Sequence, residues 1–143
     1  MQIRFTRLCQ DAQPPYRGSC DAAGYDLTAV SKNWDAERQC WIFGTGLAVE
    51  IPVGYVGLLF PRSSVFKTRY LLANCVGVID ADYRGEIKAM FRDLGNGARE
   101  YEIGERIAQL LIVPVPNVEY LEVAELSDTE RGTGGLGSTG SGR

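Results

Sequence analysis

Histidine is absent from all 143 residues, and its absence narrows the chemistry open to the protein. Ser-His and Cys-His nucleophilic pairs and His-ligated metal sites are all excluded. The four cysteines, at positions 9, 20, 40 and 75, contain no CxxC pair, so they lack the spacing of a zinc site. We expect them to be free thiols, buried or incidental. Any acid-base work therefore falls to carboxylates, tyrosine, lysine or water.

The sequence also lacks a long apolar run and an excess of positive charge. Nowhere do about 18 apolar residues follow one another, as a membrane span requires. The opening MQIRFTRLCQD carries charges where a secretory signal would be apolar. A net charge of -3 gives no support to a nucleic-acid surface. We expect a cytoplasmic protein, or one of another reducing compartment or of the host cell if viral, with no membrane or nucleic-acid partner.

Short apolar segments between glycines and prolines predict an all-β fold. Strands are expected at residues 3–7, 46–52, 55–61, 85–93 and 106–116. No apolar pattern of helical period lasts a dozen residues, and residues 63–69 are the best candidate for a short helix. Strands at this spacing favour a sandwich, a jelly roll or a barrel.

Two of these strands carry more specific predictions. In residues 85–93, Ile87, Ala89 and Phe91 alternate with Lys88, Met90 and Arg92. This alternation predicts a half-exposed strand that enters a hairpin at the turn-forming LGNGARE. Residues 106–116 are almost continuously apolar, which predicts a strand covered on both faces.

Glycine is concentrated at the C-terminus, where residues 131–143 hold six of the 17. A segment so poor in apolar side chains cannot bury enough area to offset the entropy of ordering it. We therefore expect a single domain at residues 1–126, followed by an arm at residues 127–143. The arm is either a frayed terminus or a flexible segment that folds over something else.

Three sites could carry chemistry, and each has a simpler structural explanation. Arg62, Ser63 and Ser64 stand at a strand-to-helix transition, where an anion could bind, although a serine could merely cap the helix. Asp80 follows the apolar GVI, so its carboxylate could lie at the edge of the core; with Asp82 it could equally form a turn. Gln109 interrupts an apolar strand and needs hydrogen-bond partners.

Two further segments are informative only when they are considered together with the other motifs. Asp26 follows a glycine and is expected in a turn, and Arg131 opens a run of backbone N–H groups that could cradle a phosphate. In order along the chain, AAGYDLTA, PRSSVFK, NCVGVIDADYRGEI, GERIAQLLIVP and RGTGGLGSTG resemble the five motifs of the trimeric dUTPase family. The resemblance runs from about residue 22 to residue 140, and the third and fifth motifs are the most specific.

The resemblance implies a jelly-roll-like β barrel, assembled as a homotrimer with active sites shared between subunits. The implied reaction is hydrolysis of dUTP to dUMP and pyrophosphate, with Mg²⁺ carried on the triphosphate through water and no metal ligand supplied directly by the protein. This reaction keeps uracil out of DNA and supplies dUMP for thymidylate synthesis. The C-terminal arm closes over the bound nucleotide.

The resemblance also implies roles for the third motif. Asp80 holds the attacking water and meets the sugar 3'-hydroxyl. Tyr83 packs under the deoxyribose and leaves no room for a 2'-hydroxyl. Asn74 and the backbone toward Asp80, including Val78 and Ile79, read the uracil edge in a hairpin too narrow for the thymine methyl group.

The other motifs are implied to bind the phosphates. Ser63 contacts the oxygen that bridges the α- and β-phosphates, and Asp26 lies near the metal-phosphate end. The remaining implied substrate contacts come from Arg62, Ser64, Gln109, Arg131, Leu136, Gly137, Ser138 and Thr139.

The sequence departs from the family pattern in places and leaves two other functions open. Leu136 stands where an aromatic residue is usual, Ser64 where glycine is common, and the pair Arg69 and Tyr70 replaces a glycine and an apolar residue. A stacked aromatic residue contributes roughly 1–3 kcal/mol per base in related settings, so closure of the arm could be weaker here. The alternatives are a dCTP deaminase of the same fold and a nucleotide-binding regulatory trimer.

Overall fold

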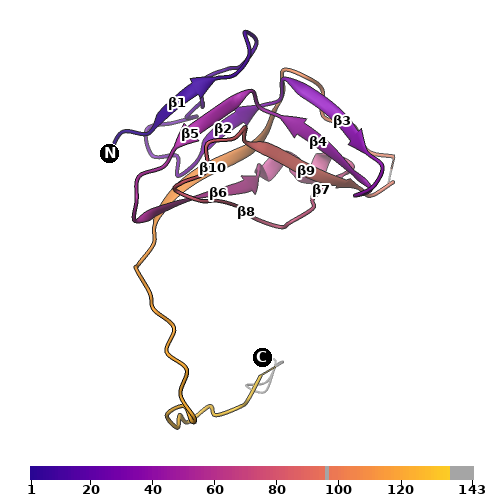
Figure 1. Cartoon of the computed structure of the whole chain (residues 1–143). Helices are drawn as coiled ribbons and strands as arrows, with labels where there is room; N and C mark the ends of the chain where they lie inside the picture. The colour runs from indigo at the N-terminus through magenta and orange to yellow at the C-terminus, as the bar shows by residue number, and fades with distance from the viewer. Residues whose placement is uncertain (96, 136–143) are drawn as a thin grey trace.

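The protein is described by a computed structural model that covers residues 1–95 and 97–135. These residues form an almost purely β structure (Figure 1). The strands are β1 (Arg4–Arg7), β2 (Tyr25–Thr28), β3 (Ser31–Asp35), β4 (Cys40–Gly44), β5 (Leu47–Glu50), β6 (Tyr55–Pro61), β7 (Tyr70–Leu72), β8 (Gly77–Ile79), β9 (Lys88–Asp93) and β10 (Arg106–Pro114). A 3-10 helix, η1 (Ser63–Lys67), lies between β6 and β7.

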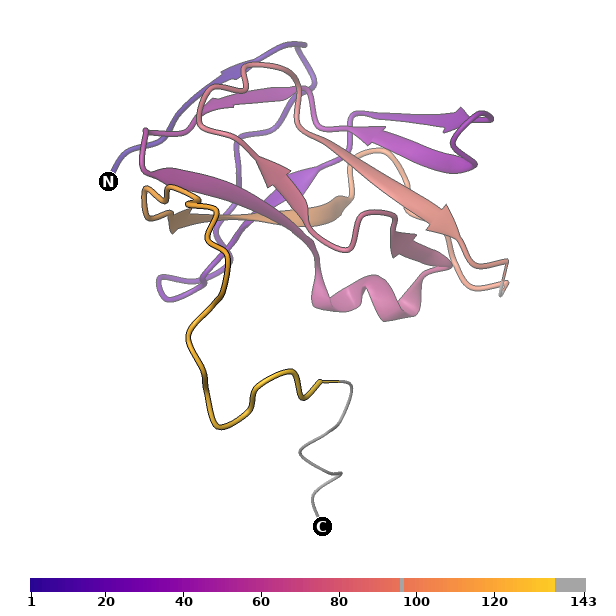
Figure 2. The ribbon, with the colours of Figure 1, turned by 60° about the horizontal axis from the view of Figure 1, so that its bottom comes forward.

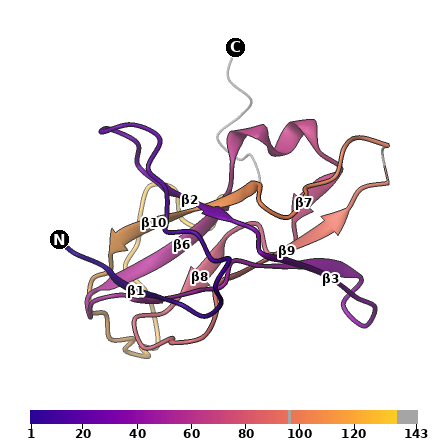
Figure 3. The same ribbon diagram turned by 90° about the horizontal axis from the view of Figure 1, so that it is seen from above.

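The strands of the described residues form two four-stranded sheets and one two-stranded sheet, all antiparallel. The first four-stranded sheet has the order β2-β10-β6-β8, and the second has the order β3-β4-β9-β7. β1 pairs with β5 in the small sheet. Figures 2 and 3 show the sheets from two further directions. Consecutive strands repeatedly change sheet, which is a jelly-roll-like topology and confirms the all-β prediction.

The core lies between the two four-stranded sheets and confirms the alternation predicted for residues 85–93. Ala89 and Phe91 in β9, with Ile87 just before it, are fully buried, whereas Lys88 and Arg92 are exposed. Both sheets contribute to one continuous cluster that contains Leu27, Phe43, Leu59, Tyr70, Phe91, Tyr101 and Leu110. Burying such side chains contributes roughly 1.5–3 kcal/mol each, so this cluster is the main stabilising element.

Charged side chains from several elements of the β3-β4-β9-β7 sheet are paired around Glu100 and Arg69. Arg69 Nε lies 2.7 Å from Asp93 Oδ1, and Arg69 Nη1 lies 3.2 Å from Glu100 Oε1. Lys32 also pairs with Glu100. The hydrogen bond from Arg69 lowers the pKa of Asp93, and the hydrogen bond from Lys32 lowers the pKa of Glu100. The departure from the family pattern at Arg69 thus introduces an ion-pair network.

Three local predictions are wrong. Residues 25–28 form β2 rather than a turn, because β2 pairs with β10. β9 does not enter a hairpin, since it pairs with β4 and β7 and the chain then crosses to the other sheet. The strand predicted at residues 106–116 exists as β10, but it is not fully covered along its length: Ile107, Ala108 and Leu110 are buried, whereas residues 109 and 111–113 are only half-covered.

Beyond β10 the chain leaves the body of the molecule (Figures 1 and 2). Residues 115–135 contain no helix or strand, and residues 114–133 are all exposed. The apolar side chains of Val118, Tyr120 and Leu121 are among them, 64%, 96% and 84% exposed. The domain boundary at residues 126 and 127 remains a prediction. No helix within the described ranges has the length and apolar character to cross a membrane.

Candidate active site

One part of the site is a cluster of Asp26, Arg62 and Arg106, called here the arginine cluster. Asp26 Oδ2 lies 3.0 Å from Arg62 Nε and 3.1 Å from Arg106 Nη1. One carboxylate and two guanidinium groups leave a net charge of +1 on a partly buried surface. The Asp26 and Arg62 side chains are only 16% and 26% exposed. Arg62 is therefore largely shielded from solvent, and the cluster is suited to an anion.

Local backbone geometry holds Arg62 in this cluster. The Arg62 backbone is extended, with φ -77° and ψ 157°, at the point where β6 ends and η1 begins. Its Nη1 donates to the Arg106 carbonyl oxygen at 3.3 Å and to Ser64 Oγ at 3.5 Å. Neither Ser63 nor Ser64 caps η1 through its side chain. Because η1 has only five residues, the positive charge here comes from the guanidinium groups and not from a helix dipole.

Gln109 connects the arginine cluster to the sheet. It is the register partner of Asp26 on β2 and of Phe60 on β6, and its Nε2 donates to the Pro61 carbonyl oxygen at 3.1 Å. Gly24 makes room for it, since a Cβ at Gly24 would lie 2.8 Å from Gln109 Oε1. The half-buried Gln109 amide thus has a hydrogen-bond partner within the chain, and this bond holds Pro61, the residue directly before Arg62.

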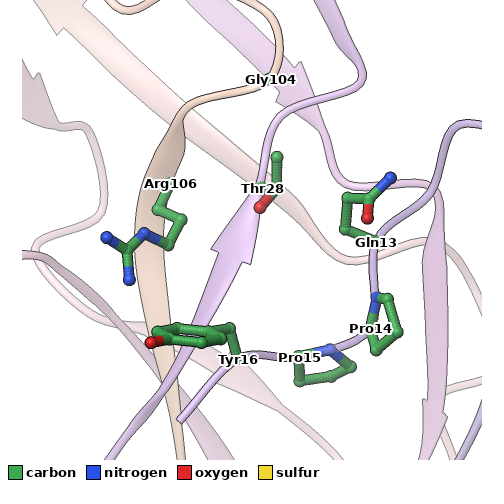
Figure 4. A pocket seen from close by; sticks show the side chains of 7 residues that line it. All are labelled: Gln13, Pro14, Pro15, Tyr16, Thr28, Gly104 and Arg106. Carbon is green, nitrogen blue, oxygen red and sulfur yellow. The ribbon is translucent and has the colours of Figure 1, made fainter. Parts of the chain in front are cut away.

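A hollow of about 450 Å³ adjoins the arginine cluster through Arg106 (Figure 4). It is lined by Gln13, Pro14, Pro15, Tyr16, Thr28, Gly104 and Arg106. The Arg106 guanidinium carbon lies 4.8 Å from the centre of the Tyr16 ring. Such a cation–π contact contributes roughly 0.5–1 kcal/mol at an exposed position. Tyr16 therefore helps to hold Arg106 against Asp26.

The second part of the site is a hollow of about 300 Å³ around β8, called here the β8 hollow. It contains five of the residues that the sequence singled out: Asn74, Val78, Ile79, Asp80 and Tyr83. Its wall is completed by Ile42, Leu59, Gly77, Glu86, Lys88 and Met90. A mixed polar and apolar lining of this kind suits a small ring with polar edges.

Tyr83 is held against its own backbone in the β8 hollow. Its hydroxyl donates to the Glu86 carbonyl oxygen at 3.0 Å. Gly85 is required for this arrangement, because a Cβ there would lie 2.4 Å from the Tyr83 hydroxyl oxygen. The tyrosine remains 43% exposed, so part of the ring faces the hollow. A glycine two residues after Tyr83 therefore allows the Tyr83 ring to be held in one position.

Asp80 directly follows β8 and is exposed in this hollow. Its carbonyl oxygen accepts a hydrogen bond from Tyr83 N at 3.1 Å, which closes a turn. Its carboxylate has no hydrogen bond or ion pair with any residue in the described ranges, and so can act on a ligand. The carboxylate is not at the buried edge of the core. Asp82, two residues later, does not line the hollow.

The turn between β7 and β8 brings Asn74 to the hollow in a strained conformation. Cys75 has φ 60°, in the left-handed region that is unfavourable for most side chains. Val76 N donates to the Asn74 carbonyl oxygen at 2.6 Å. β7 and β8 belong to different sheets, so this segment is not a hairpin of two paired strands. Backbone strain of this kind is found most often where a ligand is bound.

A single chain does not bring the two parts together. Asp26 lies on β2 and Asp80 follows β8, at opposite edges of the same sheet. Three strand spacings, about 14 Å, separate these edges. No member of the arginine cluster lines the β8 hollow. Arg131 is further away, on the exposed arm, where its Nε donates to the Gly134 carbonyl oxygen at 2.8 Å. Leu136, Gly137, Ser138 and Thr139 lie outside the described residues.

The donor set near the arginine cluster fits Mg²⁺ carried on a phosphate chain. Both ion pairs of Asp26 use Oδ2, so Oδ1 is available to accept from a metal-bound water. Mg²⁺ keeps several waters and commonly binds through one or two carboxylates together with substrate phosphates. Within residues 1–95 and 97–135, no group of three His, Cys, Asp or Glu side chains could hold a metal by itself. All four cysteines are free.

Sequence reasoning missed two residues of this region. Arg106 stands at the start of an apolar strand and completes the arginine cluster. Tyr101 lies in the core, and Ser64 and Arg62 lower its pKa against the effect of burial. An arginine at the first position of a buried strand was the available signal for Arg106. No sequence signal distinguished Tyr101.

Comparisons with known proteins agree on one family. The dUTPase family model matches residues 10–140. A deoxyuridine 5'-triphosphate nucleotidohydrolase of Nautilia profundicola is 45% identical over 141 residues, which cover 98% of this chain and 99% of the relative.

Two solved structures are also similar. A Staphylococcus bacteriophage 80alpha dUTPase with dUPNHPP has 31% identity and a TM-score of 0.83, covering 98% of this chain and 99% of its own. A mutant dUTPase from phage phi11 of S. aureus, described with a structural Mg(II) ion, has 27% identity and a TM-score of 0.73, covering 87% and 98%. The chain belongs to the dUTPase family.

Proposed function

We propose that the protein hydrolyses dUTP to dUMP and pyrophosphate. The observation that carries this proposal is an exposed, unpaired Asp80 carboxylate in a hollow next to Tyr83, in a chain of the dUTPase family. The phage 80alpha relative is described with dUPNHPP, which supports a deoxyuridine triphosphate as the ligand. We further propose that this activity keeps uracil out of DNA and supplies dUMP for thymidylate synthesis.

Asp80 acts on the water that attacks the α-phosphorus. The water oxygen forms a bond to the α-phosphorus while the bond to the oxygen that bridges the α- and β-phosphates breaks. Asp80 accepts a proton from this water, and pyrophosphate leaves. Transfer of this kind depends on positioning and on neutralising charge, which the protein can supply without histidine.

The arginine cluster receives the phosphate chain. Its net charge of +1 comes from Arg62 and Arg106 against Asp26, which already aligns both guanidinium groups in the unliganded chain. Ser63 is exposed at the start of η1 and contacts the oxygen between the α- and β-phosphates, and Ser64 and Gln109 add further contacts. Asp26 Oδ1 would accept from the waters of Mg²⁺ carried on the triphosphate, and the ion would supply additional charge neutralisation.

The β8 hollow selects the nucleoside. Asn74 and the backbone at Val78 and Ile79 read the uracil edge, in a segment too narrow to admit the 5-methyl group of thymine. Tyr83, fixed by its hydrogen bond to Glu86, packs under the deoxyribose and excludes a 2'-hydroxyl.

A complete site requires more than one copy of the chain. The arginine cluster and the β8 hollow lie at opposite edges of one sheet, so one nucleotide can meet both only if neighbouring copies each supply one part. This supports a homotrimer with shared sites. The arm, which leaves the body after β10, then has a neighbouring site to reach, where Arg131, Leu136, Gly137, Ser138 and Thr139 close over the nucleotide.

The decisive experiment measures pyrophosphate release from dUTP, dCTP, dTTP and UTP, with and without Mg²⁺. We expect release from dUTP only, and a much lower rate after chelation of Mg²⁺. Ammonia release from dCTP would instead indicate the deaminase alternative. Turnover of dUTP without any protein partner distinguishes an enzyme from a purely regulatory trimer; no turnover of any nucleotide would refute the proposal.

A further inference from the structure

The Tyr101 hydroxyl is a buried polar group without a full hydrogen bond. The residue is 1% exposed, and its hydroxyl oxygen has no partner that meets hydrogen-bond geometry among the described residues. Buried polar groups are nearly always paired, because an unpaired one loses its hydration without compensation. A phenylalanine would fill the same space without this cost. The hydroxyl therefore calls for an explanation beyond packing.

The ring of Tyr101 is locked, which fixes the direction of its hydroxyl. It stacks on Tyr70 with ring centres 5.7 Å apart and an interplanar angle of 12°. Phe43 and Phe91 contact it at 6.2 Å and 5.6 Å. The neighbouring Tyr70 hydroxyl does have a partner, since it donates to Glu100 Oε2 at 3.2 Å. Of the two stacked tyrosines, Tyr70 has a hydrogen-bond partner for its hydroxyl group, whereas Tyr101 has none among the described residues.

The loop that carries the arginine cluster acts on the Tyr101 hydroxyl. Burial raises the pKa of Tyr101, and the Ser64 side chain and the charge of Arg62 act against that rise. In the unliganded chain the hydroxyl has no partner that meets hydrogen-bond geometry among the described residues. Ser64 Oγ, which lies beside Arg62 Nη1, is the acceptor that this loop offers to the hydroxyl.

The hydrogen-bonding capacity of Ser64 decides the direction of that bond. A serine hydroxyl has one donor and two acceptor positions. Arg62 Nη1 already donates to Ser64 Oγ, and a guanidinium group cannot accept in return. If Tyr101 donates as well, both acceptor positions are filled, and the Ser64 proton must point to another acceptor. Phosphate oxygens beside Arg62 are acceptors of the required kind.

We propose that Tyr101 is a positioning residue for phosphate binding: its hydroxyl donates to Ser64 Oγ and thereby turns the Ser64 proton toward the bound phosphates. This inference rests on the proposed function, because it needs a phosphate chain at the arginine cluster. It also gives a role to Ser64, where glycine is common in the family. The Ser64 side chain binds the phosphate, and the Tyr101 hydroxyl orients it.

The test is a double-mutant cycle with Tyr101→Phe, Ser64→Ala and the double variant. We expect Tyr101→Phe to lower kcat/KM for dUTP by about fivefold, the effect of one ordinary hydrogen bond. The loss should appear mainly in KM, and the Kd for dUPNHPP should rise by the same factor. In the Ser64→Ala background, Tyr101→Phe should have no further effect. Its Tm should be unchanged or higher, because an unpaired buried group is removed.

Tyr70→Phe is the matched control, because it removes a hydroxyl from the same ring stack. That hydroxyl bonds to Glu100, away from the arginine cluster, so we expect a lower Tm with an unchanged kcat/KM. Two results would overturn the inference: full activity of Tyr101→Phe, or an equal loss from Tyr101→Phe with and without Ser64. Failure of the proposed function is a separate result, since the wild type would then not hydrolyse dUTP at all.

Discussion

Replacing Asp80 with asparagine tests the central chemical claim with little structural disturbance. The substitution keeps the shape of the side chain and removes its charge and basicity. The Asp80 backbone closes the turn with Tyr83, and its carboxylate contacts no described residue. We therefore expect the free energy of unfolding to change by less than about 0.5 kcal/mol, as at an ordinary surface position.

The expected effect on the rate is large by comparison. A positioned general base typically contributes about 10²- to 10⁴-fold. This corresponds to about 2.7–5.4 kcal/mol of the activation barrier, since each tenfold change is about 1.36 kcal/mol. Binding should change little, because the arginine cluster receives the phosphates and asparagine keeps the shape of the Asp80 side chain. The variant should thus lose kcat and retain its Kd for dUPNHPP.

The assay combines pyrophosphate release under saturating dUTP with calorimetric binding of dUPNHPP and a thermal melt. Asp82→Asn is the matched control, because it makes the same chemical change two residues away, outside the β8 hollow. We expect the control to behave as the wild type in all three measurements. A kcat for Asp80→Asn within a factor of about three of the wild type would refute the general-base assignment.

Three further predictions concern selectivity, the arm and stability. Tyr83→Ala should reduce the preference for dUTP over UTP by about tenfold or more in kcat/KM, and an unchanged ratio would exclude steric selection. Deleting residues 131–143 should leave Tm unchanged but lower kcat/KM by about tenfold or more, as for one lost hydrogen bond to a charged group; a chain that unfolds would instead show that the arm is structural. The pKa values of Asp93 and Glu100 lie below their ordinary values of 3.8 and 4.5, so their stabilising effect is complete above pH 4.5 and is lost as the pH falls through the lower folded values. Arg69→Met should flatten this decrease in Tm below pH 4.5, and an unaltered decrease would contradict the assigned cause.

Local patterns in the sequence were sufficient for five of the ten strands in the described residues, β1, β5, β6, β9 and β10, and for one half of the site. Alternation at Ile87, Ala89 and Phe91 predicted β9 correctly, because side chains of a strand point to opposite faces in turn. Asn74, Asp80 and Tyr83 lie within ten positions of one another in the chain, so the sequence could place them together. The spacing of Tyr83 and Gly85 matters for the same reason, since the ring lies against the glycine two residues away.

The arginine cluster could not be read from local patterns alone. Asp26 and Arg106 are 80 positions apart and meet only because β2 and β10 are neighbours in the sheet. Periodicity reports which face of a strand is buried, but not which strand lies beside it. For the same reason the hairpin after β9 was predicted wrongly: turn residues favour reversal of the chain, whereas packing between the two sheets decided where β10 pairs.

The sequence by itself determined the all-β class, the absence of histidine chemistry, the family, and a compact third motif that contains Asp80. Only the tertiary structure decided that Asp26 pairs with two arginines, that the β8 hollow lies at the opposite edge of the sheet from this cluster, and that the Tyr101 hydroxyl is buried without a hydrogen-bond partner among the described residues. The physical reason is the range of the interactions involved. Side-chain alternation and turn geometry act over a few residues, whereas ion pairs and buried hydroxyl contacts depend on which distant strands the core brings together.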